Sequence, residues 1–282
     1  MKKRILTIIA VVALAVVMVV GLVACAGKKE VSGFDIDLAK AIFEKEGIEV
    51  VTRKIDWSQK EIELNSGKID LVWNGLTITD ERKENMQISI PYLTNEQAVV
   101  VKGENASQYS KLSDLAGKKV AVENGSAGEE TATDIKDNKN IDITIKGITA
   151  QIDALMEVKS GQSDLAIIDS TMAGYLLNQT NGSYTDLKIV TIRDYEQQKE
   201  EYGVAAKKGN TKLIDFINTK LVELQDTKYS EVAEKYGLTD RKVTMTWTST
   251  LTGDEWKNEL KNKKKVVIGY TVNAPMGIEL DK

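Results

Sequence analysis

The sequence repeats one pattern, SGKIDL at residues 66–71 and SGQSDL at residues 160–165. In each copy a helical pattern ends at the Ser-Gly pair and an apolar strand follows, so we expect two similar lobes. Polar residues follow both strands, Asn74-Gly75 in the first copy and Asp169-Ser170 in the second. Ligands of open parallel sheets bind at such carboxyl ends. We therefore predict a ligand between the lobes; alternatively, both copies are ordinary helix stops before strands.

Around the repeats, short apolar runs alternate with helical patterns, which predicts an α/β fold with mostly parallel strands. Helices are expected over residues 35–43 and 59–64, and after Thr149, a possible N-cap for a helix that buries Ile152, Leu155 and Met156. A long apolar stripe from Leu213 to Leu224 predicts another helix. Strands are expected at residues 48–55, 69–73, 119–122, 141–145, 165–168 and 187–192.

The composition excludes several classes of protein. The chain has 282 residues, enough for one large domain or two ordinary ones, and contains no histidine. Histidine is the usual base of Ser-His-Asp and Cys-His hydrolases and the usual ligand of catalytic zinc, so these classes are excluded. The net charge is −4 and the basic residues are scattered, which argues against a nucleic-acid partner.

The first 24 residues form an export signal or a membrane span. Lys2, Lys3 and Arg4 precede a long apolar run, which fits either interpretation. The sequence Leu22-Val23-Ala24-Cys25 resembles the lipobox of bacterial lipoproteins, and Cys25 is the one cysteine of the chain. We expect residues 1–24 to be cleaved and Cys25 to carry lipid, which places the protein on the extracytoplasmic face of the cell membrane. The alternative is an uncleaved signal anchor.

Two segments have the residue types of an amino-acid site. Residues 74–82 leave a buried strand, pass Gly75 and reach Arg82 in the first turn of a helix capped by Thr79 or Asp80. Arginine suits a carboxylate because its planar fork donates two parallel hydrogen bonds. Residues 123–128 follow another strand and open another helix, where free N–H groups favour an anion. Asp169 supplies the opposite charge, so the set complements a zwitterion. Alternatively, Arg82 forms a surface salt bridge and the glycine turn is structural.

At this point the motifs resemble a known family, the solute-binding proteins of bacterial ABC transporters for polar amino acids, which have the type II periplasmic-binding-protein fold. The resemblance covers nearly the whole chain after the signal. The glycine loop has neither of the common nucleotide-binding spacings. The matching motifs, in order, are Gly33-Phe34-Asp35-Ile36-Asp37-Leu38-Ala39, Ile55-Asp56-Trp57, Ser66 to Asp70, Thr77 to Arg82, Pro91-Tyr92, Asp114 to Lys118 and Gly125-Ser126.

The resemblance implies a role for each matching position. The backbone of Gly75 and the hydroxyl of Thr77 would meet the ligand's α-amino group, and Asp169 would pair with its charge. Arg82 would hold the α-carboxylate. The backbone N–H groups that help it would be those of Ser126 and Ala127. Candidates for the pocket around the ligand's side chain are Trp73, Asn74 and Glu123.

The order of the motifs departs from the family in one place. The family opens with a strand and a ligand-contacting loop that lead into the Gly-Phe-Asp helix, whereas here that opening stands at residues 265–282. We expect a circular permutation, in which residues 248–263 join the old termini and the cleft gains Thr271, Asn273 and Met276. The alternative is the truncated start of a second, tandem copy.

The expected lobe boundaries follow from this order. Lobe 1 is expected to contain residues 26–100 and 202–247, together with residues 264–282 as its first strand and ligand loop. Lobe 2 is expected to contain residues 101–201, and the chain is expected to cross between the lobes near residues 97–102 and 202–207.

The resemblance implies a monomeric lipoprotein that captures a free amino acid and delivers it to an ABC permease and its ATPase, without a cofactor or a metal. An enzyme on the same fold, such as a dehydratase, would need a positioned carboxylic acid, for which Glu123 is the candidate. Neutral polar amino acids or cystine are expected rather than arginine, because an acidic pocket for a guanidinium would depend on Glu123 alone.

Overall fold

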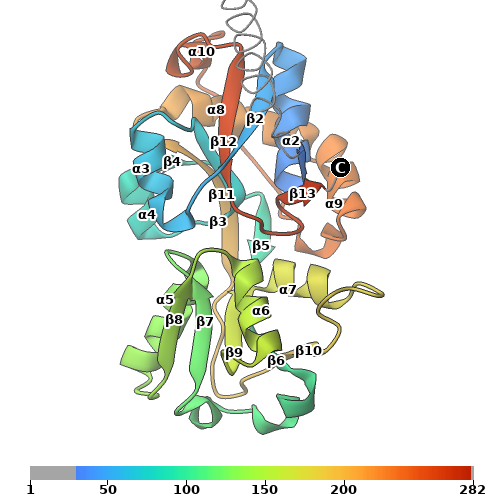
Figure 1. Cartoon of the computed structure of the whole chain (residues 1–282). Helices are drawn as coiled ribbons and strands as arrows, with labels where there is room; N and C mark the ends of the chain where they lie inside the picture. Colours follow the sequence, from blue (N-terminus) through green and yellow to red (C-terminus); the bar gives the residue numbers. More distant parts are fainter. Residues whose placement is uncertain (1–29, 281–282) are drawn as a thin grey trace, which may run out of the picture. The chain divides into compact units, whose positions relative to one another are not determined.

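The computed structural model describes residues 30–280, which form two α/β lobes, each built around one sheet (Figure 1). The expected signal segment, residues 1–24, and the expected lipidation site, Cys25, lie outside the described residues. Within residues 30–280, no helix is long and apolar enough to cross a membrane. The same part of the chain contains no group of three or more acidic, histidine or cysteine side chains that could hold a metal ion.

The sheet of lobe 1 contains a strand from the far end of the chain. Its order is β2 (Glu49–Lys54), β12 (Lys265–Tyr270), β3 (Leu71–Thr77), β11 (Glu200–Lys207) and β4 (Met86–Ile88), and β5 (Leu93–Asn95) pairs with β11. Strand β12 lies between β2 and β3 and is parallel to both, pairing with β2 along its whole length. Strand β11 is antiparallel to β3, β4 and β5.

Apolar side chains of these strands point alternately to the two faces of the sheet, so each face packs in a hydrophobic core. Leu71 and Trp73 pack in one core with most of the helices, whereas Val72 and Leu76 pack in a second core with Trp57. The helices of lobe 1 are α2 (Phe34–Phe43), α3 (Lys60–Asn65), α4 (Asp80–Asn85), α8 (Thr211–Leu224), α9 (Lys228–Lys235) and α10 (Trp256–Glu259). Single helical turns span Glu44–Glu46, Trp57–Gln59 and Thr239–Arg241.

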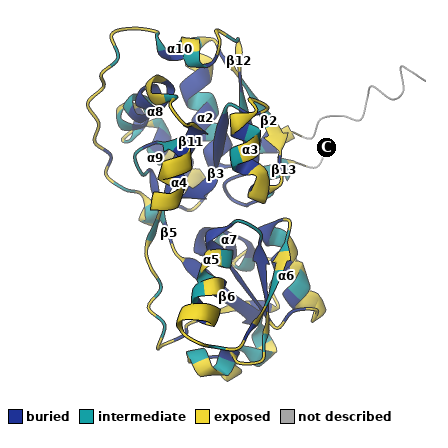
Figure 2. Ribbon diagram, turned by 90° about the vertical axis from the view of Figure 1, so that its left-hand side faces the viewer, coloured by how far each residue is buried: buried dark blue, intermediate teal, exposed yellow. Residues whose placement is uncertain are grey.

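The sheet of lobe 2 has the order β10 (Leu187–Val190), β6 (Gln97–Lys102), β9 (Leu165–Asp169), β7 (Lys119–Glu123) and β8 (Thr144–Ile148). Strands β8, β7 and β9 are parallel, and β6 is antiparallel to β9 and β10. Its strands are largely buried (Figure 2), and their alternating residues pack in two cores, one on each face of the sheet. The helices are α5 (Ala127–Thr133), α6 (Gln151–Ser160) and α7 (Ser170–Leu177), with short turns at Gly103–Gln108, Leu112–Leu115 and Asp134–Asn138.

The repeated pattern marks equivalent places in the two lobes. The first copy ends α3 and leads into β3, and the second ends α6 and leads into β9. Gly67 and Gly161 both have left-handed backbones, with φ of 71° and 76°. A residue with a Cβ is strained in this conformation, so glycine is favoured where each helix turns back toward its strand. The prediction of two similar lobes is confirmed.

Other expectations need correction. The sheets are mixed rather than mostly parallel, because strands β11 and β6 run against their neighbours. Strand β8 begins at Thr144, three residues after the expected start, and Ala150 rather than Thr149 is the N-cap of α6. Met156 is 50% exposed, so it lies outside the core. Strand β6 begins at Gln97, before the lobe boundary expected at residue 100.

The segment that precedes β12 in the chain packs against lobe 1. Trp256 of α10 stacks on Phe216 of α8, with ring centroids 3.8 Å apart and an interplanar angle of 12°. Asp215 accepts hydrogen bonds from the indole N–H of Trp247 at 2.7 Å and from the backbone N–H of Thr250 at 2.9 Å. Burial alone would raise the pKa of this carboxyl, but these bonds and one from the Thr250 hydroxyl outweigh it and lower the pKa of Asp215 to about 2. Strands β1 (Glu30–Ser32) and β13 (Ile278–Leu280) pair with each other in a separate two-stranded sheet.

Candidate functional site

A small polar pocket brings together residues from both lobes. Six of the expected site residues line it, together with Trp57, which belongs to a matching motif but was not an expected site residue, and Gln151. Its cavity is about 10 Å³, close to the least volume that holds one water molecule. The eight lining residues are Trp57, Gly75, Thr77, Arg82, Ser126, Ala127, Gln151 and Asp169.

Arg82 is held in the pocket by the start of α4. Thr79 is the N-cap of this helix, and its hydroxyl accepts a hydrogen bond from the backbone N–H of Arg82 at 3.1 Å. Only 6% of the Arg82 side chain is exposed. Its Nη1 donates to the carbonyl of Thr77 at 2.8 Å, and its Nη2 donates to the carbonyl of Gly125 at 3.3 Å and to Oε1 of Glu130 at 2.6 Å. The guanidinium therefore joins the two lobes.

The turn before α5 faces Arg82 from lobe 2. Gly125 has a left-handed φ of 71°, and the hydroxyl of Ser126 caps the helix by accepting from the N–H of Glu129 at 3.2 Å. The backbone N–H of Ser126 donates to the carbonyl of Glu123 at 3.2 Å, so the turn itself uses one of the two N–H groups expected to hold a carboxylate. The other belongs to Ala127, which lines the pocket.

Lys60 is a second buried cation beside the pocket, and the sequence did not indicate it. Its Nζ donates to the carbonyls of Gly125 at 3.0 Å and Trp57 at 3.4 Å, and it lies 5.4 Å from the centre of the Trp57 ring. Burial, followed by the nearby charge of Arg82, lowers the pKa of Lys60 to about 8. The motif Ile55-Asp56-Trp57 was the available signal for this wall of the pocket.

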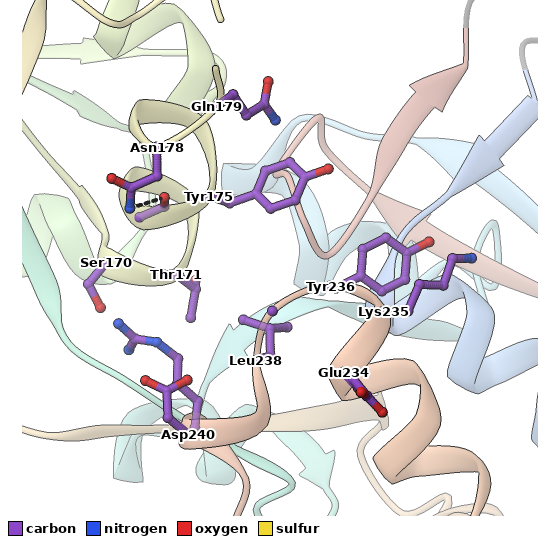
Figure 3. Close-up of a pocket in the computed structure, with 13 residues that line it drawn as sticks. Ser170, Thr171, Tyr175, Asn178, Gln179, Glu234, Lys235, Tyr236, Leu238 and Asp240 are labelled. Atoms are coloured by element: carbon purple, nitrogen blue, oxygen red, sulfur yellow. Dashed lines mark hydrogen bonds between the residues drawn. The ribbon is translucent and has the colours of Figure 1, made fainter.

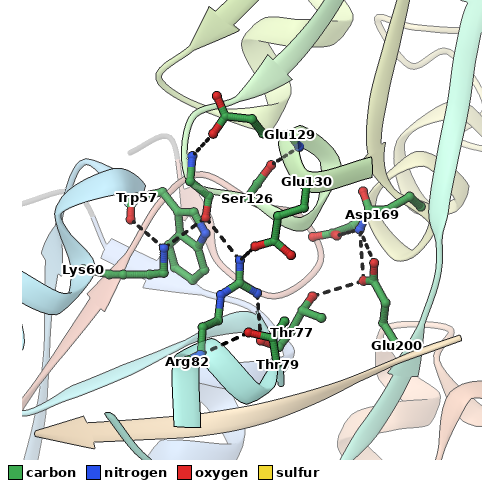
Figure 4. A network of polar contacts seen from close by, with 12 residues as sticks. Trp57, Lys60, Thr77, Thr79, Arg82, Ser126, Glu129, Glu130, Asp169 and Glu200 are labelled. Atoms are coloured by element: carbon green, nitrogen blue, oxygen red, sulfur yellow. Dashed lines mark hydrogen bonds and ion pairs between the residues drawn. The ribbon is translucent and has the colours of Figure 1, made fainter. Parts of the chain in front are cut away.

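Asp169 ends strand β9 and lies near Glu200 in the polar network of Figure 4. Its Oδ1 accepts from Gln97 at 2.8 Å and from Asn95 at 3.1 Å, and its Oδ2 accepts from Gln151 at 2.7 Å. The same two amides of Asn95 and Gln97 also donate to Glu200. Sequence reasoning missed Asn95, Gln97, Gln151 and Glu200, because three of them lie at strand ends and Gln151 begins α6, all outside any recognisable motif.

Glu123, at the end of β7, is buried beside this network. It is 1% exposed, and burial, followed by the charge of Asp169, raises its pKa to about 8. Hydrogen bonds with Thr271 and Gln151 and the charge of Lys60 act in the opposite direction. At neutral pH Glu123 is therefore mostly a neutral carboxylic acid.

The segment after β12 reaches this neighbourhood, as expected. The amide of Asn273 lies 3.5 Å from Oδ2 of Asp169, and the backbone N–H of Thr271 donates to Oδ1 of Asn74 at 2.9 Å. Met276 is fully buried and lies against the backbone of Gly75. Trp73 does not line the pocket, because it lies in the core of lobe 1 with its ring 6.2 Å from that of Tyr92.

A second cavity of about 600 Å³ lies between α7 and the end of α9 (Figure 3). Tyr175 and Asn178 line it from lobe 2, and Tyr236, Leu238 and Asp240 line it from lobe 1. None of the expected site residues lines this cavity. The polar pocket around Arg82 and Asp169 is therefore the candidate functional site.

Comparison with known proteins shows which proteins this chain is similar to. The model of the bacterial extracellular solute-binding proteins, family 3, matches residues 23–239. The chain is similar to the arginine-binding extracellular protein ArtP of Bacillus subtilis, with 32% identity over 74% of this chain and 79% of that protein. It is also similar to the L-cystine-binding protein TcyJ of Escherichia coli, with 30% identity over 73% of this chain and 74% of that protein. Among solved structures, it resembles the amino acid ABC transporter substrate-binding protein AbpA of Streptococcus pneumoniae bound to L-arginine, with a TM-score of 0.65, 29% identity, and coverage of 76% of this chain and 85% of that one.

Proposed function

Because the chain belongs to the family 3 bacterial extracellular solute-binding proteins, we propose that it captures a free amino acid outside the cytoplasm and delivers it to an ABC permease. One observation carries the proposal: a buried guanidinium, that of Arg82, and a buried carboxylate, that of Asp169, line the same small pocket. A free amino acid at neutral pH carries the two complementary charges, an ammonium and a carboxylate, on groups attached to its α-carbon. Relatives named for binding arginine and cystine support this class of ligand.

Each pocket residue then has a role in binding. Arg82 holds the α-carboxylate, with help from the N–H of Ala127. Asp169 holds the α-ammonium, with the hydroxyl of Thr77 and the carbonyl of Gly75 as further acceptors. The ligand's side chain is recognised by Trp57, Glu123 and the segment that carries Thr271 and Asn273.

Binding requires the lobes to move apart and close again, because a cavity of about 10 Å³ is far smaller than an amino acid. Two chain segments connect the sheets. One contains Glu96, between β5 and β6, and the other runs from the end of β10 at Val190 to the start of β11 at Glu200. Closure around these two connections is a hinge motion, and the closed form is the one that we propose the permease receives.

No covalent step is part of this proposal. The protein acts as a monomer, is held at the membrane by lipid on Cys25, and works with the ATPase that drives the permease. An enzyme on the same scaffold would use the buried acid of Glu123. Mass spectrometry of each amino acid after prolonged incubation with the protein distinguishes the two, and we expect every ligand to be recovered unchanged.

We also propose that the chain is a circular permutant of the family order. The support is the position of β12, which lies inside the lobe 1 sheet between β2 and β3 although it follows the matched region in the sequence. Deletion of residues 264–282 tests this. The permutation requires the truncated protein to lose its cooperative unfolding, whereas a tandem copy predicts that it still folds and binds.

The function itself is tested by thermal unfolding of the purified protein with each of the twenty amino acids and with cystine. A ligand at one hundred times its dissociation constant adds about 2.7 kcal/mol of stability, which raises the melting temperature by several degrees. We expect such a shift with one or a few amino acids and its loss in Arg82→Ala. A cooperative transition that no amino acid moves would contradict the proposal.

A further inference from the structure

Two carboxylates of the site share their hydrogen-bond donors. The amide nitrogen of Asn95 donates to Asp169 at 3.1 Å and to Glu200 at 2.9 Å, and the amide nitrogen of Gln97 donates to Asp169 at 2.8 Å and to Glu200 at 3.0 Å. Glu200 also accepts from the hydroxyl of Thr77, a residue that lines the pocket, at 3.1 Å. Within residues 30–280, neither carboxylate forms an ion pair with a lysine or an arginine.

The members of this group come from both connections between the lobes. Asn95 ends β5 and Gln97 begins β6, so they flank the first connection, and Glu200 stands at the end of the second. Asp169 lines the pocket. The group therefore links the charge of the ligand site directly to the two segments that bend when the lobes close.

Unpartnered acceptors beside the pair indicate that the group is built to receive a donor. Oδ1 of Asn273 and Oε1 of Gln97 are buried and have no hydrogen-bond partner in the described part of the chain. The amide of the same Asn273 lies 3.5 Å from Asp169. An ammonium group has three donors and one positive charge, and so supplies what two adjacent carboxylates and two free carbonyl oxygens lack.

Resting on the proposed function, we propose that Glu200 is a positioning residue of the ammonium site, and that the pair Asp169–Glu200 carries one proton which it releases when the ligand's α-ammonium binds. The proton leaves to solvent. The ligand's ammonium supplies the positive charge that the proton carried, so the net charge at the two carboxyls is the same before and after binding. Glu200 acts through Asp169 and the shared amides rather than as the main ligand contact.

The electrostatics of the group support this exchange. Burial, followed by the charge of Asp169, raises the pKa of Glu200 to about 7, while hydrogen bonds from Asn95, Gln97 and Thr77 oppose the shift. Because the two carboxyls interact strongly, they titrate as a pair. The other titratable groups that face the pair are Glu123, beside Asp169, and the phenols of Tyr202 and Tyr195, which lie near Glu200.

The sign of the pH dependence follows directly. Below pH 7 the pair holds its proton, and the ligand must displace it; above pH 7 the pair is already ionised. If only the ionised pair accepts the ligand, affinity rises about thirtyfold from pH 5.5 to pH 8. We expect the same increase in affinity with pH for every amino acid that binds, because each carries an α-ammonium group.

The test is isothermal titration calorimetry with the amino acid that binds most tightly in the thermal panel, in buffers of different ionisation enthalpy. For the wild type at pH 6 we expect release of close to one proton and the rise in affinity given above. Glu200→Gln mimics the protonated pair, so it should bind at least about thirtyfold more weakly than the wild type at pH 8, with an affinity that does not change between pH 5.5 and pH 8, and should release no proton.

Two further variants make the result specific. Glu201→Gln alters the exposed neighbouring glutamate and should behave as the wild type. Glu123→Gln removes the other raised carboxyl and should keep the proton release that depends on Glu200. The inference is overturned if Glu200→Gln retains wild-type affinity and proton release, or if Glu123→Gln alone abolishes the release; in both cases binding, and hence the proposed function, stands. A wild type that binds no amino acid at any pH contradicts both.

Discussion

Glu130 and Arg82 form an ion pair across the two lobes, with 2.6 Å between Oε1 and Nη2, in which one partner is exposed and the other is not. The side chain of Glu130 is 54% exposed, whereas that of Arg82 is 6% exposed. A ligand carboxylate that binds Arg82 from within the pocket must compete with this partner from the surface.

Replacing Glu130 should therefore tighten binding. Exposed ion pairs contribute up to about 1 kcal/mol, so Glu130→Gln should lower the dissociation constant about two- to fivefold. Calorimetric titration measures the change, and Glu84→Gln, an exposed glutamate on α4, is the matched control. A weaker complex in Glu130→Gln would mean that the ion pair helps to close the lobes on the ligand.

The planar fork of Arg82 should be required, and not only its charge. Arg82→Lys keeps the charge but cannot donate to the Thr77 carbonyl and to a carboxylate in the same geometry. Loss of a buried charged contact costs about 3 kcal/mol or more, so affinity should fall by about one hundredfold or more. Arg193→Lys, at an exposed position, should bind as the wild type. Near-normal affinity in Arg82→Lys would rule out the two-bond contact.

Asp35 should make the protein less stable as the pH rises. It is fully buried, its Oδ2 accepts from the N–H of Gly75 at 2.7 Å, and burial raises its pKa from 3.8 to about 7. The folded state therefore binds a proton that the unfolded state has already lost between these values, and stability falls across the same interval. Asp35→Asn keeps the acceptor for Gly75 and removes the proton.

We expect the stability of Asp35→Asn, relative to the wild type, to increase between pH 4 and pH 7, by about 4 kcal/mol at most. Urea unfolding at several pH values measures the difference, and Asp226→Asn, at an exposed position, should show none. Parallel curves for Asp35→Asn and the wild type would show that Asp35 is ionised in the folded protein.

The segment that carries Trp256 should be part of the folding unit. Trp256 is 2% exposed and stacks on Phe216, so Trp256→Ala should cost about 3–5 kcal/mol of stability. Chemical unfolding checks this, and Asn258→Ala, at an exposed position of α10, is the control. If Trp256→Ala unfolds like the wild type, residues 248–263 act only as a loose connection.

Much of this arrangement could be predicted from the sequence, because local patterns specified it. The Ser-Gly turns ahead of β3 and β9, the cap at Thr79 and the turn before Ser126 each have a signature within a few residues. These signatures placed Arg82, Ser126 and Asp169, and the structure brings all three to one pocket. The repeated pattern likewise indicated the two lobes.

Other features depended on contacts between distant residues, which no local pattern records. Trp73 and Trp57 have similar surroundings in the sequence, but the strand alternation of β3 turns Trp73 into the core, while Trp57 begins a helical turn at the pocket. Glu200 acquires its partners only when β5, β6 and β11 converge. The direction of β11 and β6 was missed for the same reason, since antiparallel pairing is decided by the path of the chain between lobes.

The position of β12 has a consequence for the time course of folding. The five strands of lobe 2 all lie between residues 97 and 190, so this lobe can be completed as soon as that stretch is available. Lobe 1 must wait, since β12, which lies between β2 and β3, leaves a ribosome or a translocation channel only after the other strands of its sheet. Until then the facing edges of β2 and β3 have no partner, and such edges recruit chaperones or other chains. Strand β2 of lobe 1 precedes all of lobe 2 in the sequence, but lobe 1 is completed after lobe 2 because its sheet needs β12.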